Sequence, residues 1–256
     1  MSKILVIPDS HAHPDYNNNR FRWLGRLIME EQPDIIVDIG DSADMASLCT
    51  YDKFTKQAEG RRYVADLHAY HDSQRKLFRE MNKHNNTMSK WKKKKYKPEL
   101  IKCTGNHEHR ILRASNESPE WSGHISMADL KQEHFGWDVH PFLTPAIREG
   151  IAFQHFFTSG VMGRPIGGIH QAAAMVKKNY VSCVAGHSHM RDFWEDTTPS
   201  GDRLFGLCVG CYFDYDPEFT SEADRYWRGV VILDDAHNGT AEPRFISLES
   251  IKRRFS

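Results

Sequence analysis

Five short apolar runs in this 256-residue chain each end in a group of polar or histidine-rich residues. The runs cover residues 3–8, 35–39, 100–103, 151–153 and 180–185. Their length and composition are typical of strands that are buried on both faces. In layered α/β folds, the loops that follow such strands gather along one edge of a sheet. The five polar groups are therefore predicted to share one cleft.

The segments between these runs carry helix and turn signals. Helical spacing of apolar residues predicts a helix over 20–31, and further helices are expected from residue 106 through Leu112 and over 171–178. Residues 191–246 are typical of short strands with turns at 199–202 and 237–239, which predicts a second sheet. Residues 1–256 are thus expected to form a single α/β domain.

A long insertion lies over about residues 51–98. Its 61–83 part has a helical pattern, and because structureless loops of such length are uncommon, a helical excursion beside the active-site edge is expected. It ends in a basic run, Lys90–Lys97, in which Trp91 and Tyr96 interleave with lysines. Such a mixture can contact nucleic-acid phosphates by charge and bases by stacking. We favour the other interpretation, that this run is an ordinary solvated surface. If the run does face the cleft, a nucleotide or polynucleotide substrate becomes more favoured.

Composition limits the remaining possibilities. Lys plus Arg equals Asp plus Glu at 34 each, so no net charge draws the whole molecule towards nucleic acid or an anionic membrane. No apolar run approaches the roughly 18–20 residues that span a bilayer, and the N-terminus lacks a signal-peptide pattern, which predicts a cytoplasmic protein without a membrane partner. The five cysteines are interpreted as reduced core thiols, and Cys208-x-x-Cys211 as strand packing rather than a zinc site. The oligomeric state stays open.

The polar groups carry the chemistry of a metal site. Asp, Asn and His side chains suit manganese, iron, zinc and related divalent ions, and none of the groups requires a thiolate. Two such ions about 3.5–4 Å apart can neutralise phosphate oxygens and support an in-line displacement at phosphorus.

The groups also follow an ordered pattern. They read Asp9-x-His11, Gly40-Asp41-x-x-Asp44, Gly105-Asn106-His107-Glu108, His155 and Gly186-His187-x-His189. This set resembles the calcineurin-like metallophosphoesterase superfamily, and the resemblance covers about residues 3–190. It implies a four-layer α/β/β/α sandwich of two mixed β-sheets flanked by helices, here with a helical insertion.

The resemblance also implies a role for each residue. Asp9, His11 and His189 would bind one divalent ion, Asn106, His155 and His187 a second, and Asp41 would bridge the two. Manganese is expected, with iron, zinc, nickel and magnesium as alternatives. His107 would be the catalytic residue that protonates the leaving group after attack by a bridging hydroxide, and Asp44 or Glu108 would orient its ring.

Some positions leave room for other interpretations. The family often has His-Gly in its fourth motif, whereas Phe156 follows His155 here, so His170 is a rival ligand. His13 and His109 lie next to motifs, where contact with substrate competes with a solvated loop.

The expected function is hydrolysis of a phosphate mono- or diester, with a nucleotide or nucleic acid as the expected substrate and partner. A nuclease or nucleotide phosphodiesterase and a phosphatase are both compatible with the motifs. A protein phosphatase is less favoured, because Met45 and Ala46 follow Asp44 where that branch has Arg-Gly. A non-catalytic nucleic-acid-binding protein on the same scaffold is the alternative from another class.

Overall fold

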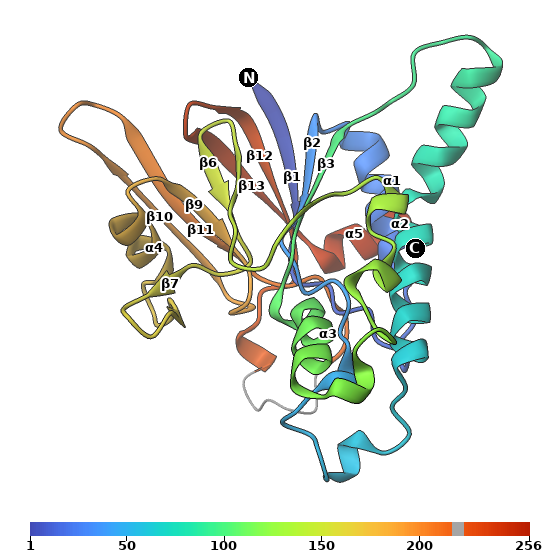
Figure 1. Ribbon diagram of the computed structural model, residues 1–256. Helices are drawn as coiled ribbons and strands as arrows, with labels where there is room; N and C mark the ends of the chain where they lie inside the picture. Colours follow the sequence, from blue (N-terminus) through green and yellow to red (C-terminus); the bar gives the residue numbers. More distant parts are fainter. Residues whose placement is uncertain (217–222) are drawn as a thin grey trace.

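The computed structural model describes residues 1–216 and 223–256, which form two mixed β-sheets with helices on their outer faces (Figure 1). The strands are β1 (Ser2–Ile7), β2 (Ile35–Asp38), β3 (Glu99–Cys103), β4 (Asp138–His140), β5 (Ala146–Arg148), β6 (Ile151–Phe153), β7 (Thr158–Ser159), β8 (Arg164–Pro165), β9 (Ser182–Ala185), β10 (Arg191–Thr197), β11 (Arg203–Val209), β12 (Gly229–His237) and β13 (Thr240–Ser247). The α-helices are α1 (Asn19–Glu31), α2 (Tyr63–Lys90), α3 (Asn106–Glu117), α4 (Gln171–Asn179) and α5 (Leu248–Phe255). All five apolar runs are strands, as predicted.

The two sheets differ in which strands they contain and in the order of those strands. The six-stranded sheet has the order β13-β12-β1-β2-β3-β4, and the five-stranded sheet has the order β10-β11-β9-β6-β5. In the first sheet, β1 to β4 are parallel, while β12 runs antiparallel to both β1 and β13. In the second, β6, β9 and β11 are parallel, and β5 and β10 are antiparallel edge strands. The predicted pair of mixed sheets is confirmed.

The strands of residues 191–246 do not all lie in the second sheet, which corrects the sequence-based expectation. Only β10 and β11 join it, and the hairpin of β12 and β13 returns to the first sheet beside β1. Val231 and Leu233 on β12 enter the core between the sheets, while Val230 and Ile232 face the helices. A strand buried on both faces fits into either sheet, so alternation of side chains could not identify its partner.

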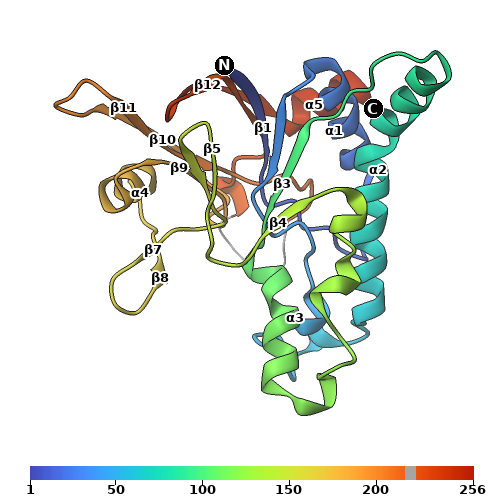
Figure 2. The same ribbon diagram turned by 45° about the horizontal axis from the view of Figure 1, so that its top comes forward.

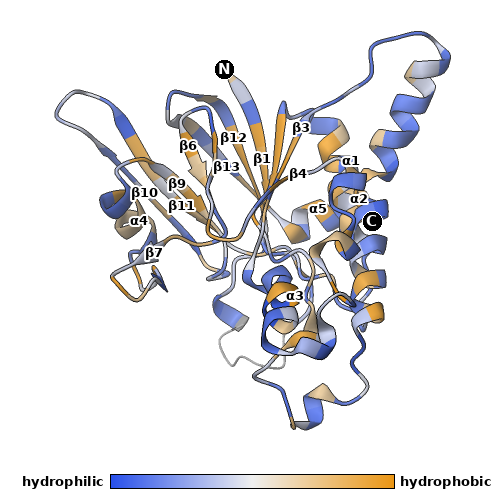
Figure 3. Cartoon of the chain, in the orientation of Figure 1, coloured by the Kyte–Doolittle hydropathy of each residue, from blue (hydrophilic) through white to orange (hydrophobic). Residues whose placement is uncertain are grey.

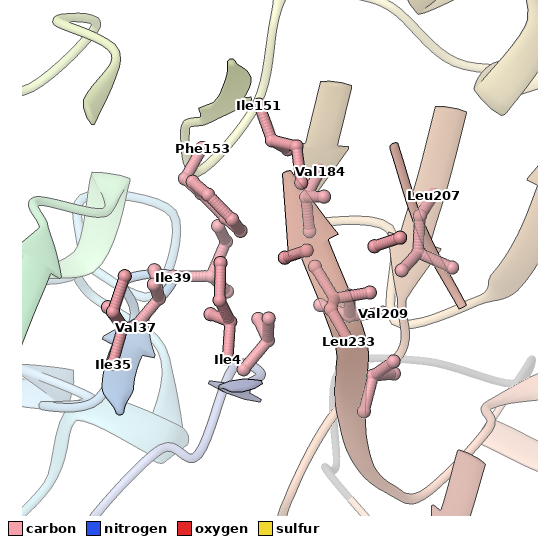
Figure 4. Close-up of a cluster of buried hydrophobic side chains, with 14 of the residues drawn as sticks. Ile4, Ile35, Val37, Ile39, Ile151, Phe153, Val184, Leu207, Val209 and Leu233 are labelled. Atoms are coloured by element: carbon pink, nitrogen blue, oxygen red, sulfur yellow. The ribbon is translucent and has the colours of Figure 1, made fainter. Parts of the chain in front are cut away.

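Three apolar layers hold the sheets and helices together. Between the sheets, Ile4, Val37 and Phe153 meet Val184 and Leu207 (Figure 4). A second cluster packs α1, α2 and α5 on the outer face of the six-stranded sheet, and a third packs α4 on the five-stranded sheet. Figure 3 shows the corresponding pattern, with hydrophobic residues along the central strands and hydrophobic and hydrophilic residues mixed along the helices. The predicted four layers, helix–sheet–sheet–helix, are therefore present.

The insertion is mostly helical, as expected, but extends further than its pattern indicated. Helix α2 has 28 residues and ends at Lys90 rather than near residue 83. Its first turns lie near the end of the sheet where β2 and β3 finish. Two hydrogen bonds hold them there, one from the Ser47 amide to Asp66 and one from the Tyr63 hydroxyl to Asp129. Its last turns lie at the opposite end, next to the start of β3 (Figures 1 and 2). The insertion thus reaches from the functional edge to the far end of the molecule.

Most of the cysteines lie in the core. Cys103, Cys183, Cys208 and Cys211 are buried, and each of the five cysteines is a free thiol. Cys208 lies in β11 and packs in the cluster under α4, whereas Cys211 lies just beyond that strand and forms isolated β-bridges with Asp9 and Arg228. No helix of residues 1–216 and 223–256 is long and apolar enough to cross a membrane. The assignment of residues 1–256 to one domain stays a prediction.

Candidate metal centre

The loops that carry the five motifs meet at the carboxyl ends of strands from both sheets. Asp9 follows β1 and Asp41 follows β2, while His155 follows β6 and His187 follows β9. Asn106 begins α3, with two residues between it and the end of β3. The convergence predicted from sequence is thus present, although the loops come from two facing sheets rather than from one sheet edge.

Three groups of donor atoms form where these loops meet. Within each group, one ligand atom per residue lies within 4.8 Å of the others, and the groups are Asp9–His11–His189, His11–Asp41–His107 and Asp41–His155–His187. Asp41 belongs to two groups, and so does His11. Aspartate oxygens and imidazole nitrogens at this spacing can hold divalent metal ions.

Direct contacts tie the donors to one another. Asp9 Oδ2 lies 3.1 Å from His189 Nε2, and Asp41 Oδ2 lies 3.1 Å from His155 Nε2. Asn106 Oδ1 lies 2.9 Å from the same His155 nitrogen, which places the amide beside the third group. All seven expected ligands therefore lie at one centre. His170, by contrast, is exposed at the N-terminus of α4 and belongs to no donor group of the described residues.

Four of the donors have backbone conformations that side-chain-bearing residues rarely adopt. The φ angles are +39° at His11, +51° at Asp41, +67° at His187 and +57° at His189. Such left-handed residues cost about 1–3 kcal/mol each and persist where the surrounding structure holds them, most often at functional sites. All four residues belong to the donor groups, so these unusual conformations coincide with the candidate metal centre.

The electrostatics of the centre favour positive charge. Burial would raise the pKa of Asp41, but His155, His107 and His11 outweigh it and hold that pKa well below its usual range. Burial lowers the pKa of His155, but Asp41 and Asp9 outweigh it and raise the pKa to about 9. The two buried carboxylates, Asp9 and Asp41, thus favour a positive charge beside them.

Two further observations test whether a metal fits. His11 Nε2 is buried without a hydrogen-bond partner, although Nδ1 lies 2.7 Å from Asp44 Oδ1. A ligating histidine typically shows this arrangement, with one nitrogen held by a carboxylate and the other free for the ion. Burial, followed by the charge of His155, lowers the pKa of His187 to about 4, so its imidazole is neutral and able to ligate. The residues present fit a divalent metal.

His107 lies beside the centre, close to the two carboxylates of Asp41 and Asp44. Its Nδ1 lies 2.6 Å from the Asp44 carbonyl oxygen and 3.2 Å from Asp44 Oδ1, and its Nε2 lies 3.8 Å from Asp41 Oδ2. Burial lowers the pKa of His107, but Asp41 outweighs it and the net pKa is raised. Of the two carboxylates considered for orienting the ring, Asp44 is in place and Glu108 is not.

Glu108 instead binds the backbone of the loop that carries Asp41. Its carboxylate is fully buried and accepts hydrogen bonds from the backbone amides of Asp41, Ser42, Ala43 and Gly105 at 2.7–3.0 Å. Lys102 is also fully buried, and its Nζ donates a hydrogen bond to the Ser42 hydroxyl. The same Nζ lies 2.8 Å from Asp38 Oδ2 and 4.0 Å from Glu108 Oε1. Lys102 was not identified from sequence, because a lysine in an apolar run gives no sign that it points inward.

Arg110 is a second residue that the motifs did not identify. Its Nη2 lies 3.0 Å from His107 Nε2, and its Nη1 donates to the Asp44 carbonyl at 3.0 Å. The available signal was its position three residues after His107, since residues three apart share a helix face. Arg110 therefore places a fixed positive charge beside the candidate catalytic histidine.

A cleft of about 660 Å³ opens from the His11 side of the centre. Its walls come from the loop after β1, the start of the insertion and residues 213–215, and they include His13, Tyr16, Lys56, Arg61 and Tyr215. His13 therefore faces the cleft and not bulk solvent alone. His109 does not line this cleft and stacks on Phe142 with ring centroids 4.4 Å apart.

The basic run does not face the cleft. Tyr96 donates from its hydroxyl to the Pro33 carbonyl, at the beginning of β2, and Glu99 begins β3. The carboxyl ends of these strands carry the metal centre, so Lys90–Lys97 lies at the other end of the molecule (Figure 2). It therefore lends no direct support to a nucleotide in the cleft.

Comparisons with known proteins return structural likeness only. No family model matches the sequence, and no curated protein matches it. YfcE, a phosphoesterase from E. coli, aligns over 96% of this chain and 99% of its own at 10% identity and a TM-score of 0.40. Pseudomonas putida nuclease MPE aligns over 94% of this chain and 87% of its own, at 15% identity and a TM-score of 0.37. A predicted phosphoesterase from Streptococcus pneumoniae aligns over 96% of this chain and 98% of its own, at 11% identity and a TM-score of 0.27. At such values, likeness transfers no activity to this chain.

Two glycines let the loops approach the ligand carboxylates. A Cβ on Gly186 would lie 2.2 Å from Asp9 Oδ1, and a Cβ on Gly105 would lie 2.1 Å from Asp41 Oδ1 and 2.3 Å from the Asp41 nitrogen. Both distances are far inside van der Waals contact. These positions explain why glycine precedes Asn106 and His187.

Gly105→Ala should therefore displace Asp41 and lower metal affinity by at least about tenfold, the lower range for loss of a group that positions a ligand. The free energy of unfolding should also fall by about 1–3 kcal/mol through overpacking. Metal titration by calorimetry and urea denaturation measure the two effects. Gly167→Ala is the matched control, because nothing lies within 4 Å of its added Cβ. Unchanged metal affinity in Gly105→Ala would show that the close approach is not needed.

Proposed function

We propose that this protein is a metal-dependent hydrolase of phosphate esters and a member of the calcineurin-like metallophosphoesterase superfamily. The observation that supports this is the meeting of seven Asp, Asn and His donors, from five loops, around the buried carboxylate of Asp41. Phosphate esters suit such paired sites, because the ester and its transition state are both anionic and the ions would neutralise that charge.

The donor groups indicate how ions would be held. Asp9, His11 and His189 would hold one divalent ion, Asn106, His155 and His187 would hold a second, and Asp41 would contact both. Manganese is the ion that we expect. When bound, the ions neutralise phosphoryl oxygens and lower the pKa of water.

The residues at the rim would handle the leaving group. His107 is proposed to donate the proton that the departing alkoxide needs. Asp44 fixes the ring through its carbonyl and carboxylate, so it acts on the reaction through His107. Arg110 is available to bind a phosphoryl oxygen once substrate separates it from His107.

The cleft is consistent with a nucleotide or nucleic acid as substrate. Its volume is within the range of sites for small organic ligands, and Tyr16 and Tyr215 stack within it with centroids 3.8 Å apart. Aromatic walls accept the face of a nucleobase.

Metal analysis combined with two chromogenic substrates tests this function. Purified protein loaded with manganese should hydrolyse bis-p-nitrophenyl phosphate faster than p-nitrophenyl phosphate, and EDTA should remove the activity. The reverse preference would indicate a phosphatase. No turnover of either substrate by metal-loaded protein would contradict hydrolysis and favour a binding protein on the same scaffold.

His107→Asn should have an effect that depends on the leaving group. With an alkyl leaving group, which needs a proton, the rate should fall by about 10²–10⁴-fold, the usual contribution of a general acid. With p-nitrophenolate, which leaves without one, the loss should be much smaller. Measurement of kcat for a series of diesters gives this comparison, with His109→Asn as the control. Equal losses across the series would exclude proton donation by His107.

A further inference from the structure

We propose that the basic loop, defined as Lys90–Lys97, is a binding site for single-stranded nucleic acid, separate from the metal centre. Its first support is charge. Residues 81–98 contain seven lysines and no aspartate or glutamate, in a chain whose net charge is zero. Within the described residues, lysine ion pairs involve Lys3, Lys76 and Lys102, and none involves the loop. The charge is therefore concentrated and is not neutralised by the protein.

The second support is an exposed aromatic ring among the charges. Trp91 is 62% exposed, and Lys93 Nζ lies 5.4 Å from the centre of its ring. Every lysine of the loop is also exposed. A ring on which a base can stack, beside cations that contact phosphates, is the combination by which proteins bind single strands without sequence preference.

The third support is that the loop is held in shape. Asn85 and Tyr96 exchange two hydrogen bonds, from Asn85 Nδ2 to the Tyr96 carbonyl at 2.8 Å and from the Tyr96 amide to Asn85 Oδ1 at 2.9 Å. The Tyr96 ring packs against the helix-side core, and its hydroxyl donates to the Pro33 carbonyl at 2.7 Å. A loop already ordered loses less entropy when it binds a partner.

The composition favours nucleic acid over a membrane surface. Amphipathic segments that bind membranes insert an apolar face among the headgroups. Over 82–98 the apolar side chains are Met88, Trp91 and Tyr96, and of these only Trp91 is exposed. A single exposed ring can stack on a base but gives no apolar face.

The position of the loop predicts a dependence on strand length, and this part rests on the proposed hydrolase function. At 1.5 Å per residue, the 28 residues of α2 separate the basic loop from the cleft end by about 42 Å. At about 3.4 Å per nucleotide, on the order of a dozen nucleotides are needed to reach both places. The basic loop should then assist long strands only.

Binding is tested without catalysis, by fluorescence anisotropy of labelled dT30 with EDTA present. Wild-type protein should bind with a salt slope of about −2.8 if four phosphates are neutralised, and Lys94→Ser/Lys95→Ser should reduce it to about −1.4. Trp91→Ala should weaken binding by about 5- to 150-fold, the range for loss of one stacked base. Lys177→Ser/Lys178→Ser, an adjacent lysine pair on α4, is the matched control and should bind as wild type.

Three results would overturn the proposal: unchanged dT30 binding in Lys94→Ser/Lys95→Ser, equal losses in the control pair, or binding to anionic phosphatidylserine vesicles but not to dT30. Circular dichroism confirms that each variant is folded. In the catalytic arm, Lys94→Ser/Lys95→Ser should raise KM for dT30 while leaving kcat and all dT6 kinetics unchanged. If metal-loaded wild-type protein cleaves nothing, the hydrolase proposal fails, whereas the anisotropy still decides whether the basic loop binds.

Discussion

Asp41→Asn is expected to lower hydrolysis of bis-p-nitrophenyl phosphate by more than about 100-fold, the upper range for residues that only orient a ligand. The Asp41 side chain is buried and belongs to two donor groups, so an amide in its place removes the charge that two neighbouring cations would share. The substitution keeps the side-chain shape, and the amide oxygen can still accept the hydrogen bond that the His107 amide donates at 2.8 Å. The loss should therefore come from metal binding and not from unfolding.

Metal content by mass spectrometry, turnover and thermal unfolding should be measured on the same preparations. Asp196→Asn on β10 is the matched control, because that carboxylate is exposed and distant from the donor groups. Wild-type turnover with a full metal complement in Asp41→Asn would refute the proposed centre. If Asp41→Asn does not fold in the absence of metal, the same measurements should be made on Asp41→Glu.

Lys102→Met should lower the free energy of unfolding by about 3–5 kcal/mol, the usual loss when one partner of a buried ion pair is removed. Asp38 and Glu108 would remain buried without their cation, although methionine fills most of the same volume. Burial already raises the pKa of Asp38 in the presence of Lys102. Without the lysine, that pKa should rise further.

The pH dependence follows from the sign of this shift. An acid whose folded-state pKa lies above its unfolded value destabilises the folded state increasingly as pH rises through that range. The deficit of Lys102→Met should therefore be largest at neutral and higher pH and should shrink as pH is lowered and Asp38 is protonated. Urea denaturation at several pH values measures it.

Two variants complete the Lys102 test. Lys102→Met/Asp38→Asn should recover part of the loss because one uncompensated charge is gone, and Lys53→Met at the surface should change stability little. A loss of less than about 1 kcal/mol in Lys102→Met would show that the buried charges do not depend on one another.

Much of the site was predictable because its residues follow strands in short motifs. The apolar runs identified the strands, and the Asp, Asn and His residues after them are the ones that meet. His155 illustrates the limit: sequence left it in competition with His170, and only the bond network around Asn106 and Asp41 places one histidine inside and the other outside.

What sequence alone determined was local: which segments are strands or helices, and which residue types stand at their ends. Tertiary structure decided which sheet β12 and β13 join, that Lys102 points inward to Glu108, that Arg110 reaches His107, and that the basic loop lies opposite the cleft. The physical reason is the distance along the chain over which each kind of preference acts. Side-chain periodicity and turn preferences act over a few residues, whereas these pairings join segments many residues apart, and their energies depend on which surfaces become buried together.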